Sequence, residues 1–152
     1  MTPPDIISAY RKTPGKQAHS ELIDFFSFKP IGSGSNELSE VSLAFRTSIV
    51  EQLLHDFSER DIQLVRDLFS EEMKCEISTG RHDNLYQLCY YLFEIGKLED
   101  SFIIYDAKFN AQNMDVGCML DREMITVGHH VDEVINYVQE EFKKNPELQA
   151  KY

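Results

Sequence analysis

The sequence lacks the segments that would carry it through or into a membrane. No window approaches the roughly eighteen uninterrupted apolar residues that a membrane-spanning helix needs. Its first five residues, Met-Thr-Pro-Pro-Asp, have neither the basic start nor the apolar run of a secretory signal. We therefore expect a soluble protein that stays in the cytoplasm.

Cysteine is also scarce. Cys75, Cys89 and Cys118 are an odd number at wide spacing, and each falls in an apolar context with helical periodicity. A free thiol in such a context behaves as a small hydrophobic side chain. We predict that all three are reduced and buried, as suits the cytoplasm.

Basic side chains are few compared with acidic ones. The chain has 15 Lys and Arg against 26 Asp and Glu, a net charge of −11. Residues 1–35 hold four basic and three acidic side chains. The excess of negative charge therefore lies in residues 36–152, which hold 11 basic and 23 acidic side chains. Such a body repels phosphate, which argues against nucleic-acid and anionic-membrane partners, and it attracts basic proteins. Solubility alone would also account for moderate acidity.

Apolar residues recur at helical spacing from residue 36 onward. One stripe predicts a long amphipathic helix and consists of Leu38, Val41, Phe45, Ile49, Leu53 and Phe57. Ser58, with Asp61 three residues later, is typical of a capping box that starts the next helix. The predicted buried face of that helix is Ile62, Val65, Leu68, Phe69 and Met73.

The second half continues with four more predicted helices. Residues 85–95 are apolar nearly all round, which indicates a central helix ended by Gly96 in a left-handed conformation. The segments 98–110 and 116–127 follow, the latter stopping at Gly128. The last helix starts at Val131, with acids first and lysines last as the helix dipole favours, and Pro146 marks its end.

These patterns predict an all-α protein with no convincing strand. We expect one domain over residues 1–152, in which residues 1–35 form less regular short helices and loops and residues 36–145 form the main body. The expected architecture is an irregular stack of antiparallel helical hairpins, either α-solenoid-like or an orthogonal bundle, with about seven to eight helices.

Residues 85–108 resemble a tetratricopeptide hairpin. The bulky, small and turn positions that carry this resemblance are Leu85, Leu88, Cys89, Leu92, Gly96, Leu98, Ser101 and Tyr105. A small residue lets two helices approach, and a glycine permits the tight turn between them. Only one copy is visible, whereas a stable array needs about three. The resemblance therefore implies a hairpin of this kind, without membership of the repeat family.

A second resemblance covers residues 88–128. It is carried by Leu88, Cys89, Tyr90, Gly96, Ala107, Lys108, Asp115, Gly117, Cys118, Asp121 and Gly128. On these residues the segment resembles small all-helical bacterial proteins, some of which are immunity proteins for secreted toxins. The resemblance implies a cytoplasmic protein that neutralises a toxin by binding it and performs no chemistry.

The most enzyme-like cluster is the sequence His129-His130-x-Asp132-Glu133. Adjacent histidines followed by carboxylates could contribute to a zinc site, but neighbours on a helix point in different directions. A turn that starts the last helix explains them as well. Cys118 with either histidine could form a thiol–imidazole pair, although the spacing does not require it. We expect neither catalysis nor a bound metal or cofactor.

Tyrosines beside acids are good material for a protein interface. The residues that we predict to contact a partner are Tyr86, Tyr90, Asp106, Asp115, Asp121 and Glu123. Core packing of the tyrosines and capping by Asp115 are the alternatives. The leading hypothesis is an acidic immunity or inhibitor protein that neutralises a basic bacterial toxin, such as a nuclease. The alternative is a helical-repeat adaptor that binds peptide segments of a partner protein.

Overall fold

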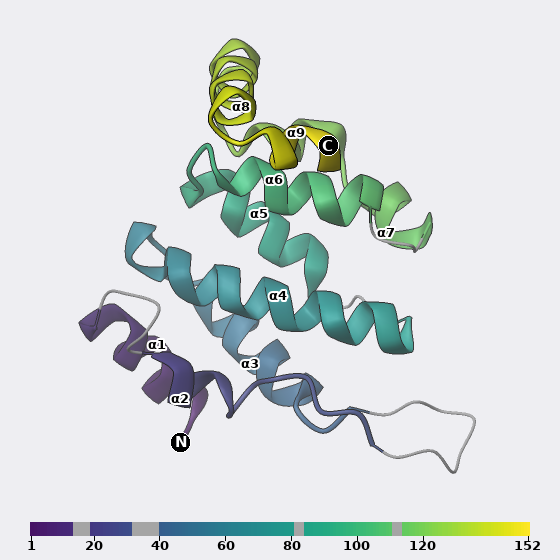
Figure 1. Ribbon diagram of the computed structural model, residues 1–152. Coiled ribbons are helices and arrows are strands. Elements are labelled where there is room, and N and C mark those ends of the chain that lie inside the picture. Colours follow the sequence, from purple (N-terminus) through teal and green to yellow (C-terminus); the bar gives the residue numbers. More distant parts are fainter. Residues whose placement is uncertain (14–18, 32–39, 81–83, 111–113) are drawn as a thin grey trace.

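The described part of the chain is built from helices (Figure 1). The structure is a computed structural model that describes residues 1–13, 19–31, 40–80, 84–110 and 114–152. Within these ranges it has nine α-helices and no strand, and the single β-bridge joins Pro30 to Glu40. The predicted all-α class is confirmed. No helix in these ranges is long and apolar enough to cross a membrane.

The amino-terminal half is organised around α4. Helix α1 (Pro3–Lys12) packs against α3 (Leu43–Leu53) and against the start of α4 (Ile62–Thr79), and α2 (Ser20–Ile23) is a single short turn. Arg11 fastens α1 to the segment that joins α3 to α4. Its guanidinium lies 2.8 Å from Asp56 and 2.7 Å from Asp61.

The long helix predicted from Leu38 to Phe57 is shorter in the structure. Val41 lies before α3 and is exposed, Phe57 lies after its end, and Leu38 is outside the described residues. The backbone N–H of Val41 donates to the carbonyl of Lys29 instead of joining a helix. This pairing between distant segments leaves no trace in the apolar period, which is why the helix start was wrong.

The predicted capping box between α3 and α4 is confirmed. The Asp61 carboxylate accepts a hydrogen bond of 2.9 Å from the backbone N–H of Ser58. Residues Glu59–Asp61 form a 3₁₀ turn that leads directly into α4. Val65, Leu68 and Phe69 of the predicted face are buried. Helix α4 ends at Gly80, which adopts the left-handed conformation that glycine tolerates best, with φ of 70°.

Helix α5 (Leu85–Ile95) packs across α4 and joins the two halves of the core. One cluster of buried apolar side chains runs from Ile6 in α1 through α3, α4 and α5 to Val127. Residues 85–95 were expected to be covered on more than one side. The structure covers Leu88 and Leu92 but leaves Tyr86 and Tyr90 exposed.

Gly96 ends α5 for a different reason from the one predicted. Its φ of −70° and ψ of 166° are extended, so the expected left-handed conformation is wrong. A Cβ at this position would lie 2.2 Å from the carbonyl oxygen of Leu92. Glycine is needed here because the chain leaves the helix too close to its last turn for a side chain.

The two segments that follow are more broken than the sequence indicates. The predicted helix 98–110 is α6 (Asp100–Tyr105), which continues as a π turn (Asp106–Asn110). The predicted helix 116–127 is divided into α7 (Met114–Met119) and a 3₁₀ turn (Arg122–Thr126). Lys108 stabilises the break, because its ammonium donates to the carbonyl of Gly117 in α7 and to that of Leu120, the first residue after it.

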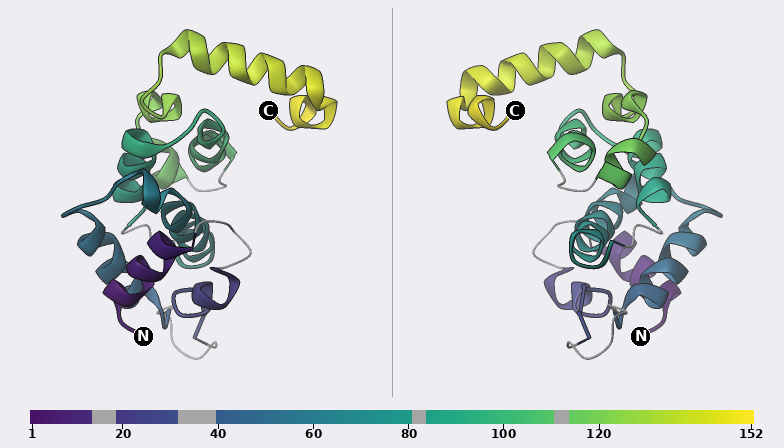
Figure 2. Two further views of the ribbon diagram at one scale, coloured as in Figure 1. Left: turned by 90° about the vertical axis from the view of Figure 1, so that its left-hand side faces the viewer. Right: turned by 90° about the vertical axis from the view of Figure 1, so that its right-hand side faces the viewer.

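The chain ends in a helical arm. Helix α8 (Val131–Lys144) reaches out beyond the rest of the molecule, and α9 (Pro146–Lys151) turns back so that the end of the chain returns toward α6 (Figure 2). Pro146 does follow the end of α8, as predicted, and it also occupies the first position of α9. The side chain of Asn145 caps α9 by accepting from the backbone of Glu147 and Leu148.

Candidate protein-binding face

The exposed side of α5 carries the two tyrosines that the sequence singled out. Tyr86 is 47% exposed and Tyr90 is 38% exposed. They stand one helical turn apart, and Glu94 follows one turn later on the same side. The opposite side of α5 is anchored in the core by Leu88 and Leu92, so the tyrosines point outward from a fixed helix.

Buried Tyr91 joins this helix to α3. Its hydroxyl donates a 2.7 Å hydrogen bond to the carbonyl of Val50, and its ring lies 4.6 Å from that of Phe57. Burial raises the pKa of Tyr91 to about 12. The neutral hydroxyl therefore remains a hydrogen-bond donor throughout the physiological range, and the α3–α5 contact is pH-independent there.

Glu51 of α3 and Leu54, the residue that follows α3, extend the exposed surface. Leu54 is 54% exposed, and with Glu51, Gln87 and Tyr91 it lines a shallow hollow of about 230 Å³ between the two helices. Phe57 links Tyr90 to this region, since its ring lies 6.0 Å from that of Tyr90 and 4.6 Å from that of Tyr91, which lines the hollow. We call the surface formed by Glu51, Leu54, Tyr86, Tyr90 and Glu94 the tyrosine face.

The acids of the tyrosine face are free to act on a partner. Glu51 and Glu94 are exposed, and neither forms an ion pair with any side chain in the described ranges. Asp121 and Glu123 are exposed as well, on the 3₁₀ turn that packs against α5. An apolar and aromatic surface with unpaired carboxylates fits a basic protein better than a neutral one.

Of the six predicted contact residues, Tyr86 and Tyr90 belong to the tyrosine face, while Asp121 and Glu123 lie on the neighbouring 3₁₀ turn and Asp106 and Asp115 lie elsewhere. Asp106 lies on the π turn, where it accepts from Lys151, Tyr152 and Asn110 at 2.6–2.7 Å. Burial favours its neutral form, but these hydrogen bonds outweigh burial and hold the pKa of Asp106 below its ordinary value. It fastens the end of the chain to the π turn. Asp115 falls inside α7 rather than at its cap, and its side chain is outside the described residues.

A second concave surface lies on another side of α4. A groove of about 610 Å³ runs between α4 and the α6–π-turn segment, with Lys151 from the end of the chain at its rim. Apolar side chains such as Met73, Ile77 and Ile103 line it, together with Ser70 and several charged residues. We call it the α4–α6 groove.

The charged residues around the α4–α6 groove are largely engaged with one another. Arg66 lies 2.6 Å from Asp100 of α6, which fixes one wall of the groove relative to the other. Lys74 pairs with Glu71 at 2.5 Å, and Asp67 accepts from the hydroxyl of Tyr10 at 2.9 Å. This groove therefore offers a partner its apolar lining more than unpaired charge.

Beneath the tyrosine face lies a buried ionic network that the sequence analysis missed. Arg46 is fully buried, with its guanidinium 2.6 Å from Glu72 and 2.8 Å from Glu40. It also donates to the carbonyl of Phe26, and Asn84 donates to Glu72. Arg46 shares the inner side of α3 with Ile49, Val50 and Leu53. An arginine within this apolar stripe was the sequence signal that could have indicated a buried ion pair. The network fixes α3, and with it Glu51 and Leu54.

The residues considered for catalysis lie on α7 and at the start of α8. His129 lies 3.8 Å from Glu133, and His130 occupies the cap position of α8. Across the described part of the chain, no three His, Cys, Asp or Glu side chains lie close enough together to hold a metal ion. Cys118 is exposed, so the prediction that it is buried is wrong, whereas Cys75 and Cys89 are buried as expected. Cys118 lies about 200° around α7 from buried Val116, so it faces away from the core.

No family model matches the chain, and no curated protein or solved structure matches it either. The resemblance of residues 88–128 to bacterial immunity proteins accordingly remains a prediction.

Proposed function

We propose that this protein is a cytoplasmic binding protein that neutralises a basic partner, most specifically a bacterial toxin domain such as a nuclease. The observation that carries the proposal is the tyrosine face. It combines exposed Tyr86, Tyr90 and Leu54 with the exposed carboxylates of Glu51 and Glu94, which form no ion pair with another described residue. The resemblance over residues 88–128 and the net charge of −11 point in the same direction.

The mechanism would be steric and electrostatic. The acidic field speeds encounter with a cationic cleft, an effect that salt weakens. Tyrosines then supply large contact areas with few rotatable bonds, which slows dissociation. The supporting scaffold is a set of helices that we propose to be an irregular stack of antiparallel hairpins in one domain, with α4 and α5 at its centre.

Co-expression with the product of the adjacent gene tests this function. The chain should co-purify with that product, inhibit its activity, and bind it less tightly as the salt concentration rises. A charge reversal in the face, Glu94→Lys, should weaken binding about tenfold or more. The matched control is Glu140→Lys on the exposed side of α8, which should change affinity less than threefold. Failure of any adjacent product to co-purify, or an affinity indifferent to salt, would count against the proposal.

The α4–α6 groove supports a second candidate, a helical adaptor that binds peptide segments. Its apolar lining and volume of about 610 Å³ suit an extended or helical peptide. Filling the groove with Ser70→Trp separates the two functions, because Ser70 is exposed and lines the groove. An adaptor would lose its peptide, whereas an inhibitor that uses the tyrosine face would bind its toxin unchanged.

A further inference from the structure

Helix α8 exposes an apolar edge along its length. Val131 is 59% exposed and Ile135 is 47% exposed, although both are large aliphatic residues. At about 100° per residue, they share one side of the helix with Val138 and Phe142, which are half-buried. Val134 is the one buried residue of α8, with 8% of its surface exposed.

The helix is held to the rest of the molecule along one side only. Phe102 of α6 lies 6.2–6.3 Å from the rings of Tyr137 and Phe142. A hollow of about 210 Å³ with mostly apolar walls separates α8 from α6. Val138 and Phe142 line this hollow, so the exposed part of the apolar edge is Val131 and Ile135, on a helix that continues beyond the body (Figure 2). This edge is what a partner could cover.

Two exposed charges flank the apolar edge and complement each other. Asp132 is the second residue of α8 and Lys143 is the second from its end. Neither forms an ion pair with another residue that the structure describes. Asp132 and Lys143 lie about 16 Å apart along the axis of α8, and the two are equally far from the midpoint of the helix.

We propose that α8 pairs in antiparallel orientation with α8 of a second copy of this chain. Full overlap about a twofold axis at the helix midpoint places each Asp132 level with Lys143 of the other copy. Val131 and Ile135 of each copy, which are exposed, then pack against the second half of α8 in the other copy. Parallel pairing would instead set like charges side by side.

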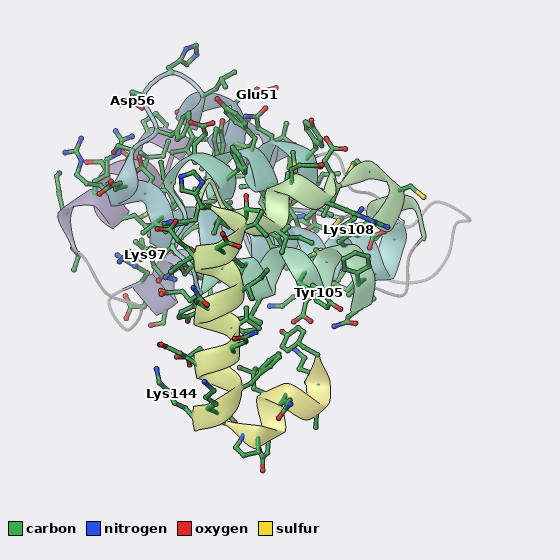
Figure 3. The ribbon with its side chains drawn as sticks, turned by 90° about the horizontal axis from the view of Figure 1, so that it is seen from above. Glu51, Asp56, Lys97, Tyr105, Lys108 and Lys144 are labelled. Carbon is green, nitrogen blue, oxygen red and sulfur yellow. The ribbon has the colours of Figure 1, made fainter. Side chains whose placement is uncertain are left out.

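The charge pattern of α8 is what favours a second copy over a foreign helix. A self-complementary surface is what a twofold interface requires, and α8 contains both halves of each ion pair. Figure 3 places α8, with Lys144 near its end, on the side of the molecule away from Glu51 and Asp56. The tyrosine face would therefore stay accessible in the dimer. This inference does not rest on the proposed function.

The dimer is expected to be weak. Two 14-residue helices in contact cover less than the roughly 1,600 Å² of a standard stable interface. We expect a dissociation constant on the order of 10⁻⁴ M. Sedimentation equilibrium of the purified full chain, from about 10 to 500 μM, covers this range.

The first test concerns the apolar edge. Ile135→Lys should make the chain monomeric over the whole concentration range, because it places an ammonium group in the interface between the two α8 helices. Val41→Lys is the matched control before α3, where the valine is also exposed, and it should dimerise like the wild type. A wild-type chain that is monomeric at the highest concentration, or an Ile135→Lys variant that dimerises normally, would overturn the proposal.

The second test addresses the orientation. Asp132→Lys and Lys143→Asp should each weaken self-association about tenfold, since each sets like charges together twice. An equimolar mixture of the two variants restores both pairs and should dimerise at least as well as the wild type. Both positions are exposed, and far-UV circular dichroism would verify the helix in each variant. A mixture that associates no better than the separate variants would contradict antiparallel pairing.

Discussion

Replacing Arg46 with methionine tests how α3 is held beneath the tyrosine face. The Arg46 guanidinium is fully buried and is shared between Glu72, Glu40 and the carbonyl of Phe26. Methionine has a similar length but no charge. The substitution therefore leaves two buried carboxylates without their cation, while the volume of the side chain is largely kept.

The expected loss of stability is large. Removing one partner of a buried ion pair costs about 3–5 kcal/mol, because the remaining charge is left in an apolar surrounding. A domain of this size has a total stability of about 5–15 kcal/mol. The double variant Arg46→Met/Glu72→Gln should recover about 1–2 kcal/mol. Glu40 would then be the one carboxylate left, and it still accepts from the backbone N–H groups of Lys29 and Ser42.

The loss should also depend on pH. Burial raises the pKa of Glu72 even beside Arg46, and removal of the arginine raises it further. A carboxyl whose pKa is raised in the folded state stabilises the fold below its unfolded pKa of about 4.3. That stability is lost as the pH rises through the folded value. The difference between Arg46→Met and the wild type should therefore shrink as the pH is lowered from about 7 to about 5.

Urea unfolding followed by far-UV circular dichroism measures both effects. The control is Arg122→Met, since Arg122 is exposed on the 3₁₀ turn after α7 and should cost less than about 0.5 kcal/mol. A loss of less than about 1 kcal/mol in the free energy of unfolding of Arg46→Met at neutral pH would refute the role given to this ion pair. A difference that grows as the pH falls would refute the assigned cause.

Further outcomes follow from the same geometry. Gly96→Ala should destabilise the fold by about 2–3 kcal/mol, because the added Cβ would collide with the carbonyl oxygen of Leu92 in α5. A urea-unfolding midpoint equal to that of the wild type would contradict this. Lys108→Met should cost about 2 kcal/mol, since the carbonyls of Gly117 and Leu120 lose their donor, and thermal unfolding by calorimetry would detect the loss. One thiol, Cys118, should react quickly with a disulfide reagent in the folded protein, and the other two only in denaturant. Burial raises the pKa of Cys75 and raises that of Cys89 to about 12, so rapid reaction of all three would be inconsistent with the structure.

The helical class and most helix positions could be predicted because they depend on local patterns. The capping box of Ser58 with Asp61 and the end of α8 before Pro146 are encoded within a few residues. The start of α3 could not be found in this way. It depends on a backbone hydrogen bond between Val41 and Lys29, which are twelve positions apart.

The same distinction applies to the candidate site. Tyr86 and Tyr90 were identified because their spacing places them together on any helix. Leu54 was missed because the expected stripe used Leu53, although an apolar residue beside a complete stripe is itself a sign of exposure. Asp106 was assigned to a surface because its partners Lys151 and Tyr152 come from the far end of the chain, and only the fold brings them together.

The most direct test of the account is the affinity of the co-purified partner for a Tyr86→Ala/Tyr90→Ala variant, measured by titration calorimetry. Central interface tyrosines cost about 2 kcal/mol or more each when truncated, so binding should weaken at least about a hundredfold. Phe109→Ala removes an equally exposed aromatic ring from the π turn and should bind like the wild type. Wild-type affinity in the double tyrosine variant would contradict the assignment of the tyrosine face as the binding surface.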